Sequence, residues 1–108
     1  MANAAAALAV LADPTRRALI DVLRRGPLTV GELARHVPVS RSAVSQHLHV
    51  LETARLVEHQ AIGTRRLYRL HPQTLGELRD YIEALWDDAL GSFAAHAEGR
   101  GRKPRRTG

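Results

Sequence analysis

Residues 39–51 read VSRSAVSQHLHVL, and this stretch decides how the rest of the chain is interpreted. Its apolar residues Val44, Leu48 and Leu51 recur with the spacing of one buried face of a helix. The opposite face carries short hydrogen-bonding side chains and almost no charge, whereas the exposed face of a helix usually carries charged residues. These polar side chains are Ser42, Ser45, Gln46 and His49. The pattern predicts a helix that presents hydrogen-bonding groups to a partner.

Sequence signals before this stretch predict two further helices. Residues 3–12 are rich in alanine, which has the highest helix propensity. Asp13 is suited to cap a second helix, and Pro14 is suited to its first position, where the missing N–H costs nothing. Gly26 and Pro27 end this second helix.

A short third helix leads directly into the quoted stretch. Thr29 and Glu32 have the spacing of a capping box at its start, and the helix closes at Pro38. Ser40 caps the next helix, which runs to about Thr53. Two consecutive short helices joined by a tight turn are typical of a helix-turn-helix.

The pattern changes after the quoted helix. Residues 56–60 and 65–70 predict two short strands, and Gly63 lies in the turn between them. The turn and the second strand are basic, with Arg65, Arg66 and Arg69. We therefore expect a mainly α fold with a small two-stranded β-hairpin, which is a winged helix-turn-helix.

A long last helix begins near Pro72 and carries an apolar seam with the alternating spacing of a coiled coil. We expect this seam and the first helix to form a homodimer interface, and the alternative is a contact inside one chain. The residues assigned to the interface are Leu8, Leu11, Leu75, Leu78, Ile82, Leu85, Trp86 and Ala89.

Composition limits the possible functions. The 108 residues suffice for one small domain. Because the chain has no cysteine, disulfides, thiolate metal sites and cysteine nucleophiles are excluded. No apolar run is long enough to cross a bilayer. We therefore expect a cytoplasmic protein with no membrane partner.

Charge is distributed unevenly along the chain, whose net charge is +5. Residues 35–70 contain six Arg and two Glu, with four of the six His. Residues 71–98 contain one Arg and six acidic residues. Residues 99–108 contain four Arg and one Lys, so we expect a basic disordered tail after a domain that spans residues 1–98. The basic middle of the chain suits double-stranded DNA as a partner.

The second helix of a helix-turn-helix enters the major groove of DNA, where base edges offer donors and acceptors. We therefore assign base contacts to Ser42, Ser45, Gln46 and His49. Groups at the helix start, on its flank and on the hairpin are placed for contacts to the DNA backbone. These are Ser40, Arg41, His47, Arg65 and Arg66. The alternatives are that Ser40 only caps the helix, that His47 packs against the body, and that the hairpin is an ordinary charged surface.

Three segments together resemble the ArsR/SmtB family of bacterial winged-helix repressors. They are DPTRRALI, AVSQHLHVL and GTRRLYRL, and the resemblance extends over roughly residues 5–95. It implies a homodimer, built from the first and last helices, that binds an inverted repeat at a promoter and represses it.

The chain departs from the metal-sensing members of that family. One of their sites uses two cysteines in the third helix, where this chain has Ala34 and His36. Another lies on the last helix; Asp80 and His96 match its outer positions, but Ile82 and Phe93 occupy the inner ones. Two ligands do not make a closed tetrahedral site, so we assign neither a metal nor a cofactor.

Other functions stay open as alternatives. One is a metal-responsive repressor with an atypical site, in which Asp87 and Asp88 join His96. A second is a non-specific architectural DNA binder that uses the basic tail, and a third is a winged helix that binds protein. No arrangement of Ser, His and Asp suggests an enzyme. The sequence identifies no effector.

Overall fold

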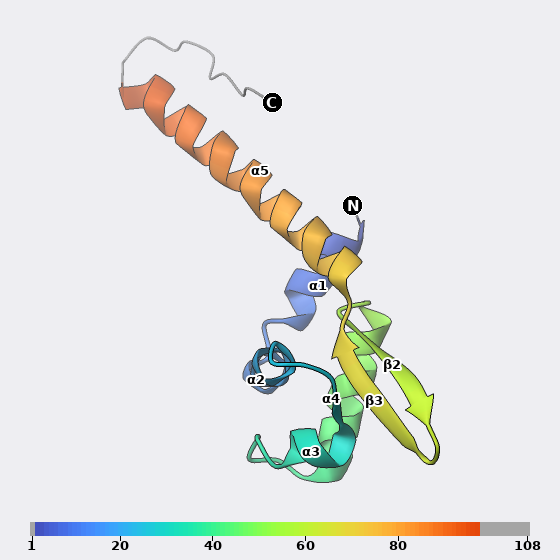
Figure 1. Ribbon diagram of the computed structural model, residues 1–108. Helices are drawn as coiled ribbons and strands as arrows, with labels where there is room; N and C mark the ends of the chain where they lie inside the picture. Colours follow the sequence, from blue (N-terminus) through green and yellow to red (C-terminus); the bar gives the residue numbers. More distant parts are fainter. Residues whose placement is uncertain (1, 98–108) are drawn as a thin grey trace.

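Five helices and three strands follow one another in the computed structural model, which describes residues 2–97 (Figure 1). They are α1 (Ala2–Val10), α2 (Pro14–Leu23), β1 (Leu28–Thr29), α3 (Val30–Ala34), α4 (Arg41–Thr53), β2 (Val57–Ile62), β3 (Arg65–Leu70) and α5 (Pro72–Ala97). This order confirms the predicted winged helix-turn-helix. The predicted tail, residues 99–108, lies outside the described residues. No helix in the described part of the chain is long and apolar enough to span a membrane.

The predicted helix starts are confirmed. The Asp13 carboxylate accepts the backbone N–H groups of Thr15 and Arg16 at 2.7 and 3.1 Å. The Ser40 hydroxyl accepts the N–H of Ala43 at 3.1 Å. Each side chain therefore satisfies donors that the first turn of a helix leaves unpaired.

The sheet has one strand more than the sequence predicts. Strand β1 pairs with β3, so that the sheet order is β1-β3-β2, with Leu28 opposite Tyr68. At two residues, β1 is too short to show the alternation by which a strand is recognised. Gly63 closes the β2–β3 hairpin with a φ of 62°, the left-handed region that glycine adopts without strain.

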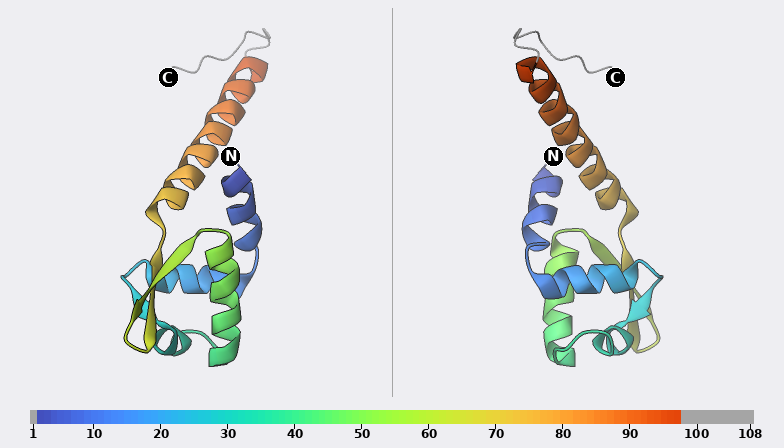
Figure 2. Two further views of the ribbon diagram at one scale, coloured as in Figure 1. Left: turned by 90° about the vertical axis from the view of Figure 1, so that its right-hand side faces the viewer. Right: turned by 90° about the vertical axis from the view of Figure 1, so that its left-hand side faces the viewer.

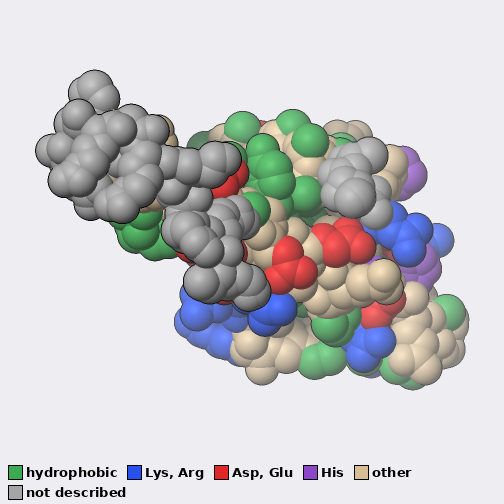
Figure 3. All heavy atoms as spheres, turned by 90° about the horizontal axis from the view of Figure 1, so that it is seen from above, with side chains coloured by type: hydrophobic (Ala, Val, Ile, Leu, Met, Phe, Trp, Pro, Cys, Tyr) green, Lys and Arg blue, Asp and Glu red, His purple; other side chains and the backbone are tan. Residues whose placement is uncertain are grey.

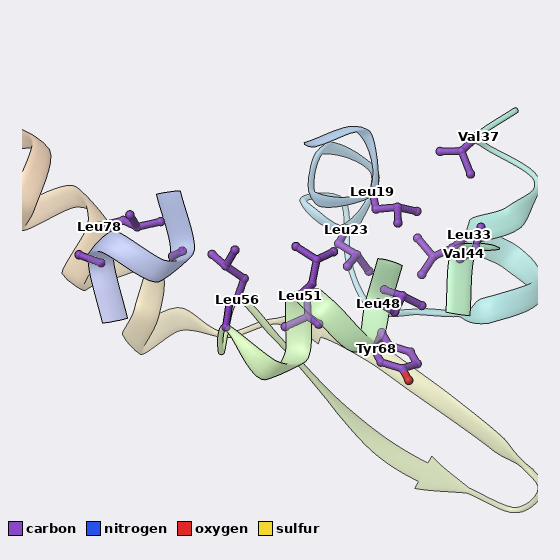
Figure 4. Packing of buried hydrophobic residues seen from close by; sticks show 14 residues of the cluster. Leu19, Leu23, Leu33, Val37, Val44, Leu48, Leu51, Leu56, Tyr68 and Leu78 are labelled. Carbon is purple, nitrogen blue, oxygen red and sulfur yellow. The ribbon is translucent and has the colours of Figure 1, made fainter. Parts of the chain in front are cut away.

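The core joins the helix-turn-helix to the sheet. Helix α2 lies across the middle of the body between α4 and the hairpin (Figure 2). Leu19, Leu48 and Leu51 are fully buried there, and Tyr68 of β3 closes the core on the sheet side (Figure 4). Burying a leucine contributes about 1.5–3 kcal/mol, so this cluster fixes how α4 is presented.

Helix α1 is held to α2 by the two arginines that follow Pro14. The Nε of Arg16 donates to the Val10 carbonyl at 2.8 Å, and Nη1 of Arg17 donates to the Leu11 and Ala12 carbonyls at 2.8 and 3.0 Å. These side chains satisfy carbonyls that the end of α1 leaves free. Helix α1 is thereby placed against the start of α5.

Helix α5 leaves the body as a rod, and α1 lies beside its first turns only (Figures 1 and 2). This divides the predicted dimer seam. Leu78 is 7% exposed and belongs to the core of its own chain, and Leu11 and Leu75 pack against that core. At Leu78 this burial favours the alternative, a contact inside one chain. The remaining seam residues are exposed: Leu8, Ile82, Leu85, Trp86 and Ala89.

Candidate nucleic-acid interface

Helix α4 separates its apolar and polar residues as the sequence predicts. Val44, Leu48 and Leu51 are fully buried, which leaves the opposite face of the helix open. The four side chains assigned to base contacts are all exposed, and they are Ser42, Ser45, Gln46 and His49. Hydroxyl, amide and imidazole groups on one open helix face can exchange hydrogen bonds with base edges.

His47 differs from its neighbours because it is half-buried. It lies near the start of α2, where its charge acts on Asp13. The pKa of the Asp13 carboxyl lies below its ordinary value of 3.8, first because it accepts the N–H of Arg16 and further because the charges of Arg16 and His47 are close. This position favours the alternative that His47 packs against α2.

A groove of about 750 Å³ runs between α3, α4 and the wing, which is the β2–β3 hairpin. Four arginines line it, namely Arg35, Arg41, Arg65 and Arg66. Ser45 of α4 lines the same groove, so a candidate base contact and four positive charges share one concave surface. A concave surface with an excess of positive charge attracts a polyanion.

Arg41 lies in this groove close to α3. Its guanidinium lies against Gly31 of α3, where an added Cβ would be 3.5 Å from the Arg41 Cζ. The Arg41 side chain thus reaches from α4 to the surface of α3.

Arg35 is missing from the residues assigned on the sequence. Arg35 is the C-cap of α3. The DNA contacts predicted from the sequence all lie on α4, at its cap or on the wing. The available signal was its place at the start of the basic segment 35–70. Only the fold shows that the end of α3 opens onto the same groove as the wing tip.

Polar contacts fix the base of the wing, one to α4 and one between its two strands. Nδ1 of His59 lies 2.7 Å from a carboxylate oxygen of Glu52 at the end of α4. Arg69 donates from Nε to Glu58 of the adjacent strand at 2.6 Å. Arg69 is thus engaged within the sheet, whereas Arg65 and Arg66 line the groove.

The last helix provides no assembled metal site in the part of the chain that the structure describes. Among these residues no three His, Asp or Glu side chains gather in a metal-binding arrangement. The side chain of His96, a candidate ligand by its spacing from Asp80, lies outside those described. Figure 3 views the molecule from the end where α5 lies, and there hydrophobic and acidic side chains lie next to each other at the surface.

Comparison with known proteins identifies the family. Residues 13–59 match the model for bacterial regulatory proteins of the arsR family, a segment that runs from the cap of α2 to β2. The HTH-type transcriptional regulator Rv2034 of Mycobacterium tuberculosis is 54% identical over 91 residues, which are 84% of this chain and 85% of that protein. The chain belongs to the ArsR family. It is a DNA-binding transcriptional regulator and not an enzyme.

Two further proteins are similar to large parts of this chain at lower identity. The transcriptional repressor SdpR of Bacillus subtilis is 34% identical over 65 residues, which are 60% of this chain and 72% of that protein. A solution structure of a homodimeric winged helix-turn-helix DNA-binding domain from Mycobacterium bovis has a TM-score of 0.65 and 26% identity, and covers 83% of both chains. The ArsR fold of this chain thus extends into α5, beyond the segment matched by the family model.

Proposed function

We propose that the protein is a homodimeric repressor of transcription that binds an inverted-repeat operator in the cytoplasm. Each protomer places α4 in a major groove, where Ser42, Ser45, Gln46 and His49 read base edges. The exposed polar face of α4, which opens onto the arginine-lined groove, is the observation that carries this proposal.

Contacts to the DNA backbone come from the groove and from the start of α4. Arg41, Arg65 and Arg66 retain the role assigned on the sequence, and Arg35 joins them. Ser40 is exposed, and its hydroxyl already accepts the N–H of Ala43. Its hydroxyl proton stays available to donate to a phosphate oxygen. His47, half-buried beside α2, is removed from this set.

Two copies associate through α5. The described chain covers the apolar face of α5 only at its first turns, and leaves Leu85 51% and Trp86 64% exposed. An apolar stripe of this length on one helix marks a protein interface. The Mycobacterium bovis domain with a similar fold is a homodimer. A two-fold axis through the dimer explains the inverted repeat, because half-sites mirror the symmetry of the protein.

The name of the Bacillus subtilis relative, a transcriptional repressor, supports repression over activation. A regulator that occupies a promoter through two successive major grooves excludes other proteins from the same DNA. Repression therefore needs only binding, with no further activity.

The test is binding of the full chain to a duplex from the promoter region of its own gene, mapped by footprinting, and to a random duplex of equal length. Gln46→Ala should weaken binding to the mapped site by about 1–3 kcal/mol and change binding to the random duplex little. Gln73→Ala, at an exposed glutamine near the start of α5, is the matched control and should change neither. Equal losses on both duplexes for Gln46→Ala would assign Gln46 a phosphate-contact or packing role in place of base readout.

A further inference from the structure

Glu32 is the acidic residue that lines the groove with Arg35, Arg41, Arg65 and Arg66. We propose that Glu32 lowers the affinity of this groove for the DNA backbone, and so sets how tightly the protein holds any duplex. This inference rests on the proposed function, because it requires that phosphates enter the groove.

The carboxylate of Glu32 is fixed in place by the start of α3. Its Oε1 accepts the backbone N–H of Thr29 at 2.9 Å and the Thr29 hydroxyl at 3.1 Å. In return, the Thr29 hydroxyl oxygen accepts the N–H of Glu32 at 3.3 Å. The Glu32 side chain would have to break its two hydrogen bonds to Thr29 in order to move away from an approaching phosphate.

Glu32 is charged at neutral pH. The backbone N–H of Thr29 is the main cause that holds the pKa of the Glu32 carboxyl below its ordinary value of 4.5, and the charges of Arg65 and Arg35 act in the same direction. A permanent negative charge therefore faces the space that a phosphate would occupy.

The geometry favours repulsion of phosphate over a role in orienting the arginines. Among the described residues no ion pair joins Glu32 to the four arginines of the groove. The Arg41 guanidinium lies beside Gly31 of α3. Removing the charge at Glu32 should therefore leave the arginines in place and remove only the repulsion.

The test compares two variants that gain the same charge. Glu32→Gln keeps the capping box, because Gln is accepted at this position. Asp21→Asn is the matched control, because Asp21 lies on α2 outside the groove and is exposed. Binding of the full chain to its mapped promoter site and to a random duplex is measured between about 0.05 and 0.3 M salt.

We expect Glu32→Gln to bind both duplexes about threefold to tenfold more tightly at low salt, with a gain that shrinks as salt is added. Asp21→Asn should show a smaller gain. Unchanged helicity and thermal unfolding of Glu32→Gln will show that the capping box is intact. A gain no larger than that of Asp21→Asn, or weaker binding, would overturn the proposal.

Two arginine variants distinguish this failure from failure of the proposed function. If Arg41→Ala and Arg66→Ala weaken binding to both duplexes while Glu32→Gln has no effect, the groove binds DNA and only the role of Glu32 is wrong. If neither arginine variant changes binding, phosphates do not enter the groove, and both the role of Glu32 and the backbone contacts proposed for the arginines fail.

Discussion

Helices α4 and α5 both expose a stripe of side chains, but the two exposed stripes differ in chemistry. Along α4 the exposed residues include Ser42, Ser45 and Gln46, which carry hydroxyl and amide groups. Along α5 they include Leu85, Trp86 and Phe93, with Phe93 70% exposed. Water can form hydrogen bonds with the polar side chains of α4. The apolar side chains of α5 cannot form such bonds, and their transfer from water to an apolar interface is favourable. An exposed polar stripe therefore suits a polar partner that dissociates, and an exposed apolar stripe suits a lasting one.

The largest expected effect comes from placing a charge in the apolar stripe of α5. Leu85→Asp should bury a carboxylate in the dimer interface, at a cost of about 3 kcal/mol or more. The dissociation constant of the dimer should then rise at least about 100-fold. Sedimentation equilibrium measures this change, and circular dichroism shows whether the body stays folded.

Ala84→Asp is the matched control for that variant. Ala84 is also exposed on α5 but lies outside the apolar stripe, among residues that face the acidic side of the helix. The Ala84→Asp variant should remain a dimer. A dimeric Leu85→Asp variant would place the interface elsewhere and would remove the contrast between the two stripes.

The second effect tests where the seam on α5 changes from core to interface. In a Leu85→Asp background, Leu78→Ala should lower the free energy of unfolding by about 2–5 kcal/mol, because it leaves a cavity beside α1. Ile82→Ala, one turn further on, should cost less than about 1 kcal/mol there, because Ile82 is half exposed in the single chain. Urea unfolding measures both. Equal losses would mean that the boundary lies beyond Ile82.

This boundary shows what could be predicted from the sequence and what could not. The caps at Asp13, Thr29 and Ser40 were predictable because each acts within a single turn of its own helix. The apolar spacing of α5 was also predictable. Helix α1 covers only part of this apolar stripe, and which part depends on the lengths of α1 and α5 and on the angle between them. The spacing of apolar residues in the sequence gives neither the lengths nor the angle.

The candidate site divides in the same way. The polar face of α4 follows from helical spacing alone, and the basic wing follows from the turn at Gly63. Arg35 and Glu32 enter the site because α3, α4 and the wing tip enclose one groove. Such a long-range arrangement has no local sequence signal. The sequence left two roles open for His47 for the same reason, because the α2 terminus beside it lies more than thirty residues away in the chain.

A smaller effect is expected at the end of α4. Arg55 has a φ of 63°, in the left-handed region, and the N–H of Leu56 reaches back to the Leu51 carbonyl at 2.9 Å. Glycine adopts this backbone conformation without strain. Arg55→Gly should therefore raise the free energy of unfolding by about 1 kcal/mol. Thermal unfolding should show a higher midpoint, whereas Arg55→Lys should leave it unchanged.

Because Arg55 lies outside both exposed stripes, this variant should alter neither promoter binding nor dimerisation. A loss of DNA affinity in Arg55→Gly would contradict that expectation. It would extend the DNA-binding surface of α4 to the end of the helix, where the polar stripe and the body meet.

The smallest expected effect is a pH dependence of the free energy of unfolding that arises in the body and not in α5. Helix α2 begins at the carboxylate of Asp13, whereas the first turn of α5 contains no acidic residue. Because the pKa of Asp13 is lowered in the folded chain, its contribution is complete above the unfolded value of about 3.9 and is lost as pH falls through the folded value. Asp13→Asn keeps the cap, since Asn is as good an N-cap as Asp, but cannot titrate.

Urea unfolding at a series of pH values should therefore give similar profiles for the two proteins above about pH 5. Below about pH 4 the stability of the wild type should fall more steeply than that of Asp13→Asn. The same difference should appear in the monomeric Leu85→Asp background, because Asp13 acts within the body. If the difference vanished in the monomer, the acid sensitivity would belong to the α5 contact between two copies, and Asp13 would act only through dimerisation.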